Sequence, residues 1–365
     1  MFKNLLHLTS IILIIVSTIV LGQAGEEDFA KLNYSDDVTK TGTSSANFLE
    51  IGFGTAGSAM GDAYVSIAND LSSIYWNPAG LSYMEQSEAQ FIHQPWIADI
   101  NTTFAALGIV LPNVGTFSLG LIHVGYGDME VTTLEMQNGT GEIFTANDFV
   151  VSLSYGRKLA NWFAFGASGK FISSKIWHSG ASAFAVDMGV IVNTRFFSFT
   201  GKRKDGMNIG MSISNYGTKM KYDGMDLLQP IDILPYEEGN FRDVAGKFNL
   251  QAWELPLIFR IGLSINPIVI GQQRLTLAVD ALHPNNNAES INLGLQYKLT
   301  IPTTGDFYLR GGYKALYLED SEYGLSLGGG TTLRMMNNFA IKFEYAYRGV
   351  GVLGKTHCYT VGILF

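Results

Sequence analysis

The feature that most constrains this chain is a period-two alternation of apolar residues with small or polar ones. It is clear over 257–265, where every second residue is apolar: Leu257, Phe259, Ile261, Leu263 and Ile265. The same spacing recurs over 291–299 and 339–347. Successive side chains of a strand point to opposite faces, so each segment has one apolar face and one small or polar face. The pattern therefore predicts β-strands.

The apolar faces of these strands need an apolar environment, either a protein core or lipid. A soluble sandwich also alternates and packs its apolar set inward. Here many aromatic residues fall near segment ends, as in the girdles of membrane barrels: Trp96, Tyr155, Trp162, Phe163, Tyr297, Tyr313, Tyr323, Tyr345 and Tyr347. The opposite faces carry charged residues among Gly, Ser and Ala, and we expect these to line a lumen: Lys170, Asp187, Arg260, Asp280, Lys298, Arg310, Lys342 and Glu344. These features favour strands that face lipid.

Composition supports a membrane barrel and excludes other classes. Only 15% of the residues are charged, whereas soluble domains average about a quarter. No segment after the N-terminus has 18 uninterrupted apolar residues, so helical membrane spanning is not predicted. The net charge of −8 argues against a nucleic-acid partner, which needs concentrated Lys and Arg. The partner we expect is outer-membrane lipid.

About 14 strands are predicted from residue 88 onward, an even number as single-chain bacterial barrels have. The approximate segments are 88–98, 101–111, 115–126, 149–158, 162–175, 182–193, 207–216, 256–266, 273–281, 290–299, 306–315, 322–332, 337–347 and 356–365. The longest connections, near 127–148 and 217–255, both follow odd-numbered strands, so they lie at one end, as outer loops do. The connection around 194–206 is long for the opposite end. The expected fold is an all-β transmembrane antiparallel barrel with a small N-terminal helical hatch in the lumen.

Both ends of the chain carry features of an exported barrel. Residues 1–24 read as a secretory signal peptide, with Lys3 before an apolar stretch and small residues after it, although an uncleaved anchor is the alternative. Residues 25–45 form an N-terminal extension. One face of the last segment ends in an aromatic residue, which resembles the assembly signal read by the barrel-assembly machinery: Tyr359, Val361, Ile363 and Phe365. We expect a protein of the outer membrane of a Gram-negative-type bacterium.

Residues 46–87, ahead of the barrel at 88–365, break the strand pattern and are predicted to form a hatch. Met60, Tyr64 and Ile67 have helical spacing, so a helix is expected over 56–69. Pro78 lacks an N–H and favours an extended Asn77, which predicts a rigid turn after the helix.

The same segment resembles the N-terminal hatch of FadL-like barrels, and most closely their PorV/PorQ branch, which is associated with type IX secretion. The motif residues are Gly57, Gly61, Asp62, Asp70, Asn77, Pro78, Ala79 and Gly80. Later pieces, such as 185–190, 213–217 and 309–313, are similar to that branch too. The resemblance implies a 14-stranded barrel with a lumenal plug.

Two short motifs are typical of enzymes but lack the required context. Residues 52–57 match G-x-G-x-x-G without the flanking parallel strands of a dinucleotide site. Residues 324–328 match G-x-S-x-G, but Ser326 lies in an alternating strand and not at a strand-to-helix turn. The histidines are scattered, without metal-ligand spacing. We predict no enzyme activity, no cofactor and no metal.

Two active functions remain open at this point, and a purely structural barrel is the fallback. The resemblance implies an accessory that receives or shuttles cargo at the type IX translocon, with outer loops as docking surfaces. The long loop carries an apolar strip suited to this role: Leu227, Leu228, Ile231, Ile233, Leu234 and Tyr236. The strip alternatively folds over the mouth of its own barrel. The second function is a FadL-like channel for hydrophobic small molecules such as long-chain fatty acids, with the hatch as gate.

Overall fold

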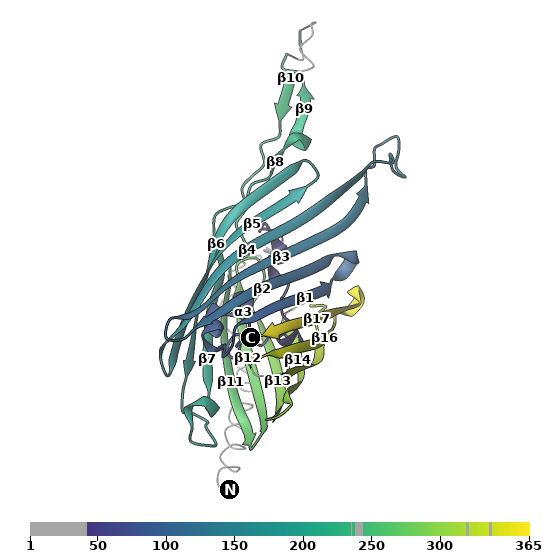
Figure 1. The fold of residues 1–365 in the computed structure, drawn as a ribbon. Helices are drawn as coiled ribbons and strands as arrows, with labels where there is room; N and C mark the ends of the chain where they lie inside the picture. Colours follow the sequence, from purple (N-terminus) through teal and green to yellow (C-terminus); the bar gives the residue numbers. More distant parts are fainter. Residues whose placement is uncertain (1–41, 235, 238–243, 319–320, 336–337) are drawn as a thin grey trace, which may run out of the picture. The chain divides into compact units, whose positions relative to one another are not determined.

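The computed structural model describes residues 42–234, 236–237, 244–318, 321–335 and 338–365. Within these residues, fourteen long strands form one closed antiparallel ring (Figure 1). The strands are β1 (Glu88–Pro95), β2 (Asn101–Leu111), β3 (Gly115–Glu130), β4 (Ile143–Ala160), β5 (Phe163–Ile176), β6 (Ser179–Asn193), β7 (Asn208–Gly217), β11 (Ile258–Ile270), β12 (Gln273–Pro284), β13 (Ser290–Ile301), β14 (Gly305–Leu316), β15 (Leu325–Arg334), β16 (Ala340–Gly349) and β17 (Lys355–Leu364). The predicted barrel class and strand number are confirmed.

Each strand of the ring pairs with its neighbours along the chain, apart from two junctions. Strand β7 pairs with β11 because a separate hairpin is inserted between them. The ring closes where the first strand pairs with the last, with Phe91 opposite Val361. A closed ring leaves no unpaired strand edge, which a sheet in lipid requires.

The two faces of the wall have opposite chemistry. Along β11, Arg260 and Ser264 are 3% and 2% exposed, whereas Ile261 and Leu263 are 37% and 45% exposed. The apolar side chains thus look outward and the polar ones inward, as the alternation predicts. None of the described helices is long and apolar enough to cross a membrane.

The two ends of the barrel differ in the length of their connections. One end carries turns that follow β2, β4, β6, β11, β13 and β15, most of them short. The other end carries the loops that follow β3 and β7, including the projecting hairpin in Figure 1. Outer-membrane barrels have short periplasmic turns and longer outer loops. We therefore call the first the short-turn end and the second the outer end.

The connection predicted at 127–148 is shorter in the structure, because both flanking strands extend into it. Strand β3 continues to Glu130 and β4 already begins at Ile143, so only 131–142 connects them. A register shift between Gly125 and Asp128 marks where this ribbon leaves the regular wall. Sequence alternation weakens there, so the sequence predicts an end of β3 that is too early and a start of β4 that is too late.

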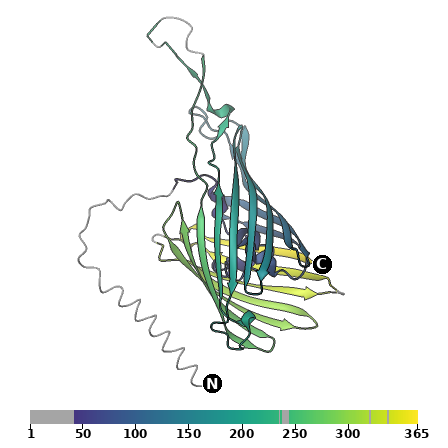
Figure 2. The same cartoon turned by 90° about the vertical axis from the view of Figure 1, so that its left-hand side faces the viewer.

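The hatch consists of short helical turns inside the ring (Figure 2). They are η1 (Asn47–Glu50), α2 (Thr55–Ala59), α3 (Ser73–Trp76) and η2 (Pro78–Tyr83). The segment enters at the outer end, where the Ser45 amide donates to the Glu254 carbonyl at 2.8 Å. It leaves at the short-turn end, where the side-chain amide of Gln86 donates to the backbone carbonyl of Asn338 at 2.9 Å. The predicted signal peptide 1–24 and nearly all of the extension 25–45 lie outside the described residues.

The single helix predicted over 56–69 is wrong. Helix α2 ends at Ala59, and Gly61 and Asp62 follow with φ of 63° and 68°, a left-handed geometry that breaks the helix. The next amides, of Tyr64 and Val65, donate to a barrel carboxylate instead of a helical carbonyl. Contacts with the wall override local helical spacing here.

The remaining elements belong to connections. The loop after β7 contains β8 (Asp223–Gly224), η5 (Met225–Leu227), β9 (Leu228–Ile231) and β10 (Val244–Lys247). Strands β9 and β10 form their own two-stranded sheet beyond the barrel. Single turns η3 (Ile97–Asp99), η4 (Arg203–Asp205) and η6 (Gly351–Leu353) lie in other connections.

Candidate functional site

A buried ionic cluster ties the first half of the hatch to the wall. Asp62 forms ion pairs with Arg348 of β16 and with Lys314 of β14, the latter at 2.7 Å. Arg348 also donates to the Ser58 carbonyl at 3.2 Å and thereby holds the end of α2. The side chains of Asp62 and Arg348 are 4% and 3% exposed, so the pair is shielded from bulk water.

A second cluster ties the other half of the hatch. Lys342 of β16 lies 3.2 Å from an oxygen of Asp70 in the hatch and 2.6 Å from Glu88 of β1. From β12, one carboxylate oxygen of Asp280 accepts from the amides of Tyr64 and Val65 at 2.7 and 2.9 Å. Side chains of at least three wall strands, β1, β12 and β16, thus take part in the contacts that hold the hatch.

The other residues predicted to line the lumen also point inward. Arg310 pairs with Glu344 at 2.7 Å, and Lys170 pairs with Asp187. Lys298, paired with Asp306 at 2.9 Å, is 30% exposed. The remaining member, Arg260, stacks 5.5 Å from the ring centre of hatch Tyr75. Seven of the eight are buried.

Sequence reasoning missed three wall residues of these clusters, although the signal was present. Lys314 follows Arg310 by four residues, and Arg348 follows Glu344 by four, so each lies on a strand face already assigned to the lumen. Glu88 is the first residue of the first strand and falls where the boundary was least certain.

Glycines mark where the hatch and wall come into close contact. A Cβ on Gly57 would lie 2.5 Å from the Trp76 ring, which explains the glycines at 52–57 without any nucleotide. On the wall, a Cβ on Gly166 would overlap Pro78, and one on Gly312 would overlap Met60. Glycine inside a strand often marks such a close backbone approach.

Asn77 fixes the hatch turn as the sequence predicts. Its backbone is extended, with φ −163° and ψ 106°, and its side chain accepts from the Ala79 amide at 3.1 Å. The side-chain amide donates to the carbonyls of Val65 in the hatch and Val190 in the wall at 2.9 and 3.1 Å. Asn77 therefore joins two hatch segments to β6.

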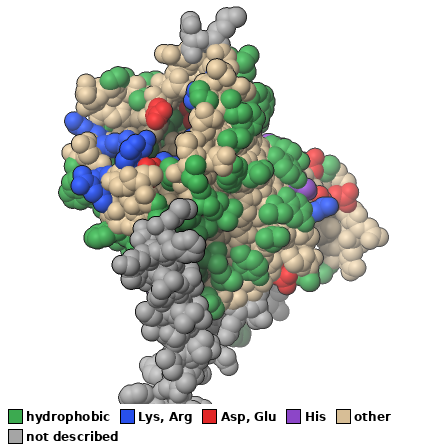
Figure 3. All heavy atoms as spheres, turned by 90° about the horizontal axis from the view of Figure 1, so that it is seen from below, with side chains coloured by type: hydrophobic (Ala, Val, Ile, Leu, Met, Phe, Trp, Pro, Cys, Tyr) green, Lys and Arg blue, Asp and Glu red, His purple; other side chains and the backbone are tan. Residues whose placement is uncertain are grey.

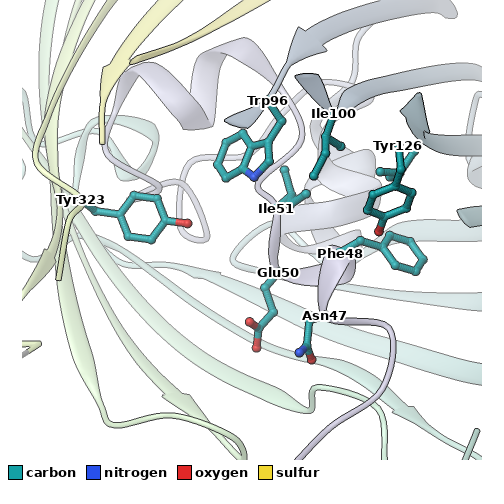
Figure 4. A pocket seen from close by; sticks show the side chains of 9 residues that line it. Asn47, Phe48, Glu50, Ile51, Trp96, Ile100, Tyr126 and Tyr323 are labelled. Atoms are coloured by element: carbon teal, nitrogen blue, oxygen red, sulfur yellow. The ribbon is translucent and has the colours of Figure 1, made fainter. Parts of the chain in front are cut away.

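A small cavity of about 250 Å³ opens at the outer end, between the hatch and the outer loops (Figure 4). Its wall is mostly apolar and aromatic: Phe48, Ile51, Trp96, Ile100, Val124, Tyr126 and Tyr323, with Asn47 and Glu50 as polar groups. Burial raises the pKa of the Glu50 carboxyl above its ordinary 4.5, partly opposed by a hydrogen bond with Asn286. Trp96 and Tyr323 therefore line a cavity and do not belong to the predicted lipid girdle.

The apolar strip of the long loop lies on the β9–β10 hairpin, away from the barrel (Figures 1 and 2). Leu227 is partly buried, and the other five are exposed: Leu228 45%, Ile231 46%, Ile233 56%, Leu234 40% and Tyr236 100%. The interpretation in which the strip covers its own barrel mouth does not fit these exposures.

The remaining residues considered in the sequence lie at the C-terminal strand and on β15. The four on the last strand look outward, between 41% and 52% exposed: Tyr359, Val361, Ile363 and Phe365. Ser326 is fully buried in β15 and accepts from Arg348 at 3.4 Å. Cys358 is buried against Thr55 of the hatch.

The fold and the tethered hatch define a plugged β-barrel of the outer-membrane type. A family model described as type IX secretion system protein PorV matches residues 34–234, which include the hatch and the first seven strands. This match covers more than half of the chain, and the chain belongs to the PorV family. No curated protein sequence matches the chain.

Solved structures with a similar fold are transport barrels. The toluene transporter TodX of Pseudomonas putida is 11% identical, with a TM-score of 0.52, over 86% of this chain and 96% of that one. The toluene transporter TbuX of Ralstonia pickettii is 11% identical, with a TM-score of 0.50, over 86% and 97%. The monoaromatic hydrocarbon channel CymD is 11% identical, with a TM-score of 0.52, over 86% and 97%. At this identity the likeness concerns the fold alone.

Proposed function

We propose that this protein is an outer-membrane accessory of type IX protein secretion, which docks cargo or translocon through the β9–β10 hairpin. Membership of the PorV family supports the secretion role. The observation that carries the docking role is the exposed apolar strip, whose Tyr236 is fully exposed. Large apolar side chains held on a projecting hairpin are typical of a surface that another protein covers.

The fixed hatch favours docking at the outside over passage through the lumen. Two ionic clusters and the Asp280 carboxylate hold it from several strands. A hatch that opens must leave these buried charges without partners, which costs about 3–5 kcal/mol for each pair broken.

The test replaces Ile231, Ile233 and Tyr236 by Ser and follows secreted cargo in cell fractions. Loss of a central apolar anchor typically costs at least about 2 kcal/mol, or about 30-fold in affinity. We expect cargo to accumulate in the periplasm while the barrel stays at its normal level in the membrane.

A matched control changes three equally exposed apolar residues of the other long outer ribbon: Leu134, Met136 and Ile143. We expect normal secretion from this control. Normal secretion from the hairpin variant would refute the docking role.

The outer cavity favours a second candidate, a channel for small hydrophobic molecules. Its volume lies just below the roughly 300–1,000 Å³ of pockets for drug-sized ligands, so it suits one aromatic ring better than a long fatty acid. Uptake of labelled toluene and of a labelled fatty acid into proteoliposomes tests this function. Equal uptake by empty liposomes would exclude it.

A further inference from the structure

The connection between β6 and β7 forms an ordered turn with unusual chemistry at the short-turn end. It exposes three phenylalanines, Phe196 at 70%, Phe197 at 49% and Phe199 at 50%. The same turn carries a basic run, Lys202 to Lys204, and Arg195 precedes the phenylalanines. A chain of net charge −8 has concentrated cations and aromatic rings here.

This turn is held firmly on the barrel rim. Arg274 of β12 pairs with Asp205 at 2.5 Å. The Met207 amide donates to the Phe196 carbonyl at 2.8 Å. Asp205 is 2% exposed and already paired, so it leaves the cations of the turn largely uncompensated. No ion pair is found for Arg195, Lys202 or Lys204 within the described part of the chain.

The neighbouring turn, between β4 and β5, repeats the same chemistry. It exposes Leu159 at 63% and Trp162 at 48%, beside the cations Arg157 and Lys158. The Asn193 amide donates to the Trp162 carbonyl at 2.8 Å and joins the two turns. Viewed from this end, Lys and Arg side chains gather on one side, with hydrophobic side chains around them (Figure 3). We call these two turns the basic-aromatic rim.

We propose that the basic-aromatic rim binds anionic phospholipids of the periplasmic leaflet. The rim lies where the lipid-facing strands end, so its aromatic rings are at the depth of the membrane interface. Cations beside an apolar anchor are the usual recognition pattern for anionic headgroups. The inference rests on the outer-membrane location and not on the secretion role, so either can fail alone.

The experiment is native mass spectrometry of the full protein with phosphatidylglycerol or with phosphatidylcholine of the same acyl chains. The measured quantity is lipid retention, the fraction of the protein that keeps a bound lipid. Replacing Arg195, Lys202 and Lys204 by Ser leaves the Asp205–Arg274 pair intact. Each cation near an anionic surface strengthens binding about fivefold, so we expect the loss of three cations to lower phosphatidylglycerol retention by about 100-fold. Phosphatidylcholine retention should stay unchanged.

Two further variants make the result specific. Replacing the three phenylalanines by Ser should lower retention of both lipids, because the anchor and not the charge is lost. Replacing Lys219, Lys221 and Lys355, exposed cations of the outer end, should change neither. The shift of the unheated gel band verifies that each barrel is folded. If the triple cation variant does not fold, Lys204→Ser alone should lower phosphatidylglycerol retention about fivefold.

Three results would overturn the proposal. Unchanged phosphatidylglycerol retention in the cation variant would show that the rim does not bind the lipid. Displacement by inorganic phosphate, but not by chloride at equal ionic strength, would show a site for a free anion. Loss of a co-purifying periplasmic protein with lipid retention intact would assign the rim to a protein partner.

Discussion

Replacing Asp62 by Asn should release the hatch without unfolding the barrel. Among the described residues, Asp62 is the only carboxylate that forms an ion pair with Arg348 or with Lys314, and all three side chains are at most 12% exposed. Removing one member of a buried ion pair costs about 3–5 kcal/mol, because the remaining charge stays buried and uncompensated. At 1.4 kcal/mol for each factor of ten, the opening equilibrium of the hatch should rise about 100- to 5,000-fold.

Hydrogen–deuterium exchange of the detergent-solubilised protein measures that opening. The amides of Tyr64 and Val65 donate to Asp280 of the wall and are hydrogen-bonded in this way only while the hatch is docked, so their exchange should accelerate by that factor. Amides between β12 and β13 should keep their rates, because the ring does not depend on Asp62. The control is Asp223→Asn, which removes an exposed partner of Lys247 on the outer loop. Hatch amides that exchange within threefold of the unmodified protein would refute the ionic tether.

Three further predictions concern packing and pH. Gly312→Ala should prevent the hatch from docking, because its Cβ would overlap the Met60 backbone, and should therefore lower the yield of folded barrel. The control Gly311→Ala, whose Cβ has its nearest neighbour at 3.4 Å, should fold normally. The band of the unheated protein on a gel measures folding of both variants. Trp76→Ala should cost about 3–5 kcal/mol, measured by denaturant unfolding, because it empties the centre of the hatch core; an unchanged midpoint would contradict this role. Glu50→Gln should stabilise the protein at neutral pH, since burial raises the pKa of Glu50 and disfavours its ionised form. This gain should shrink as the pH falls through the raised pKa and vanish below 4.5, where the carboxyl is protonated in both folded and unfolded states. A gain that persists in acid would contradict the assignment.

The wall was predictable from sequence because its constraint is local. A period of two assigns each side chain to one face of its strand. The inward position of Arg260 and the outward position of Ile261 therefore follow from the residues two positions away in the sequence. The same parity would have placed Lys314 and Arg348 in the lumen.

The hatch was less predictable because distant contacts determine its backbone. The pairing of Asp62 with Arg348 joins positions 286 residues apart, and no periodicity encodes such a pair. Left-handed geometry at Gly61 and Asp62 fits this docking and ends a helix that local spacing favours. The outer cavity was missed for the same reason, since Glu50 and Trp96 meet only once the hatch is seated.

The path of the hatch has a consequence for the order of folding. Residues 44–87 pass through the ring from one mouth to the other, beginning beside Glu254 and ending beside Asn338. Proteins rarely pull a chain through a loop that is already shut. We therefore expect the strands to wrap around a hatch already in place, with the pairing of β1 and β17 forming last. A variant whose hatch cannot dock should stop folding before β1 pairs with β17.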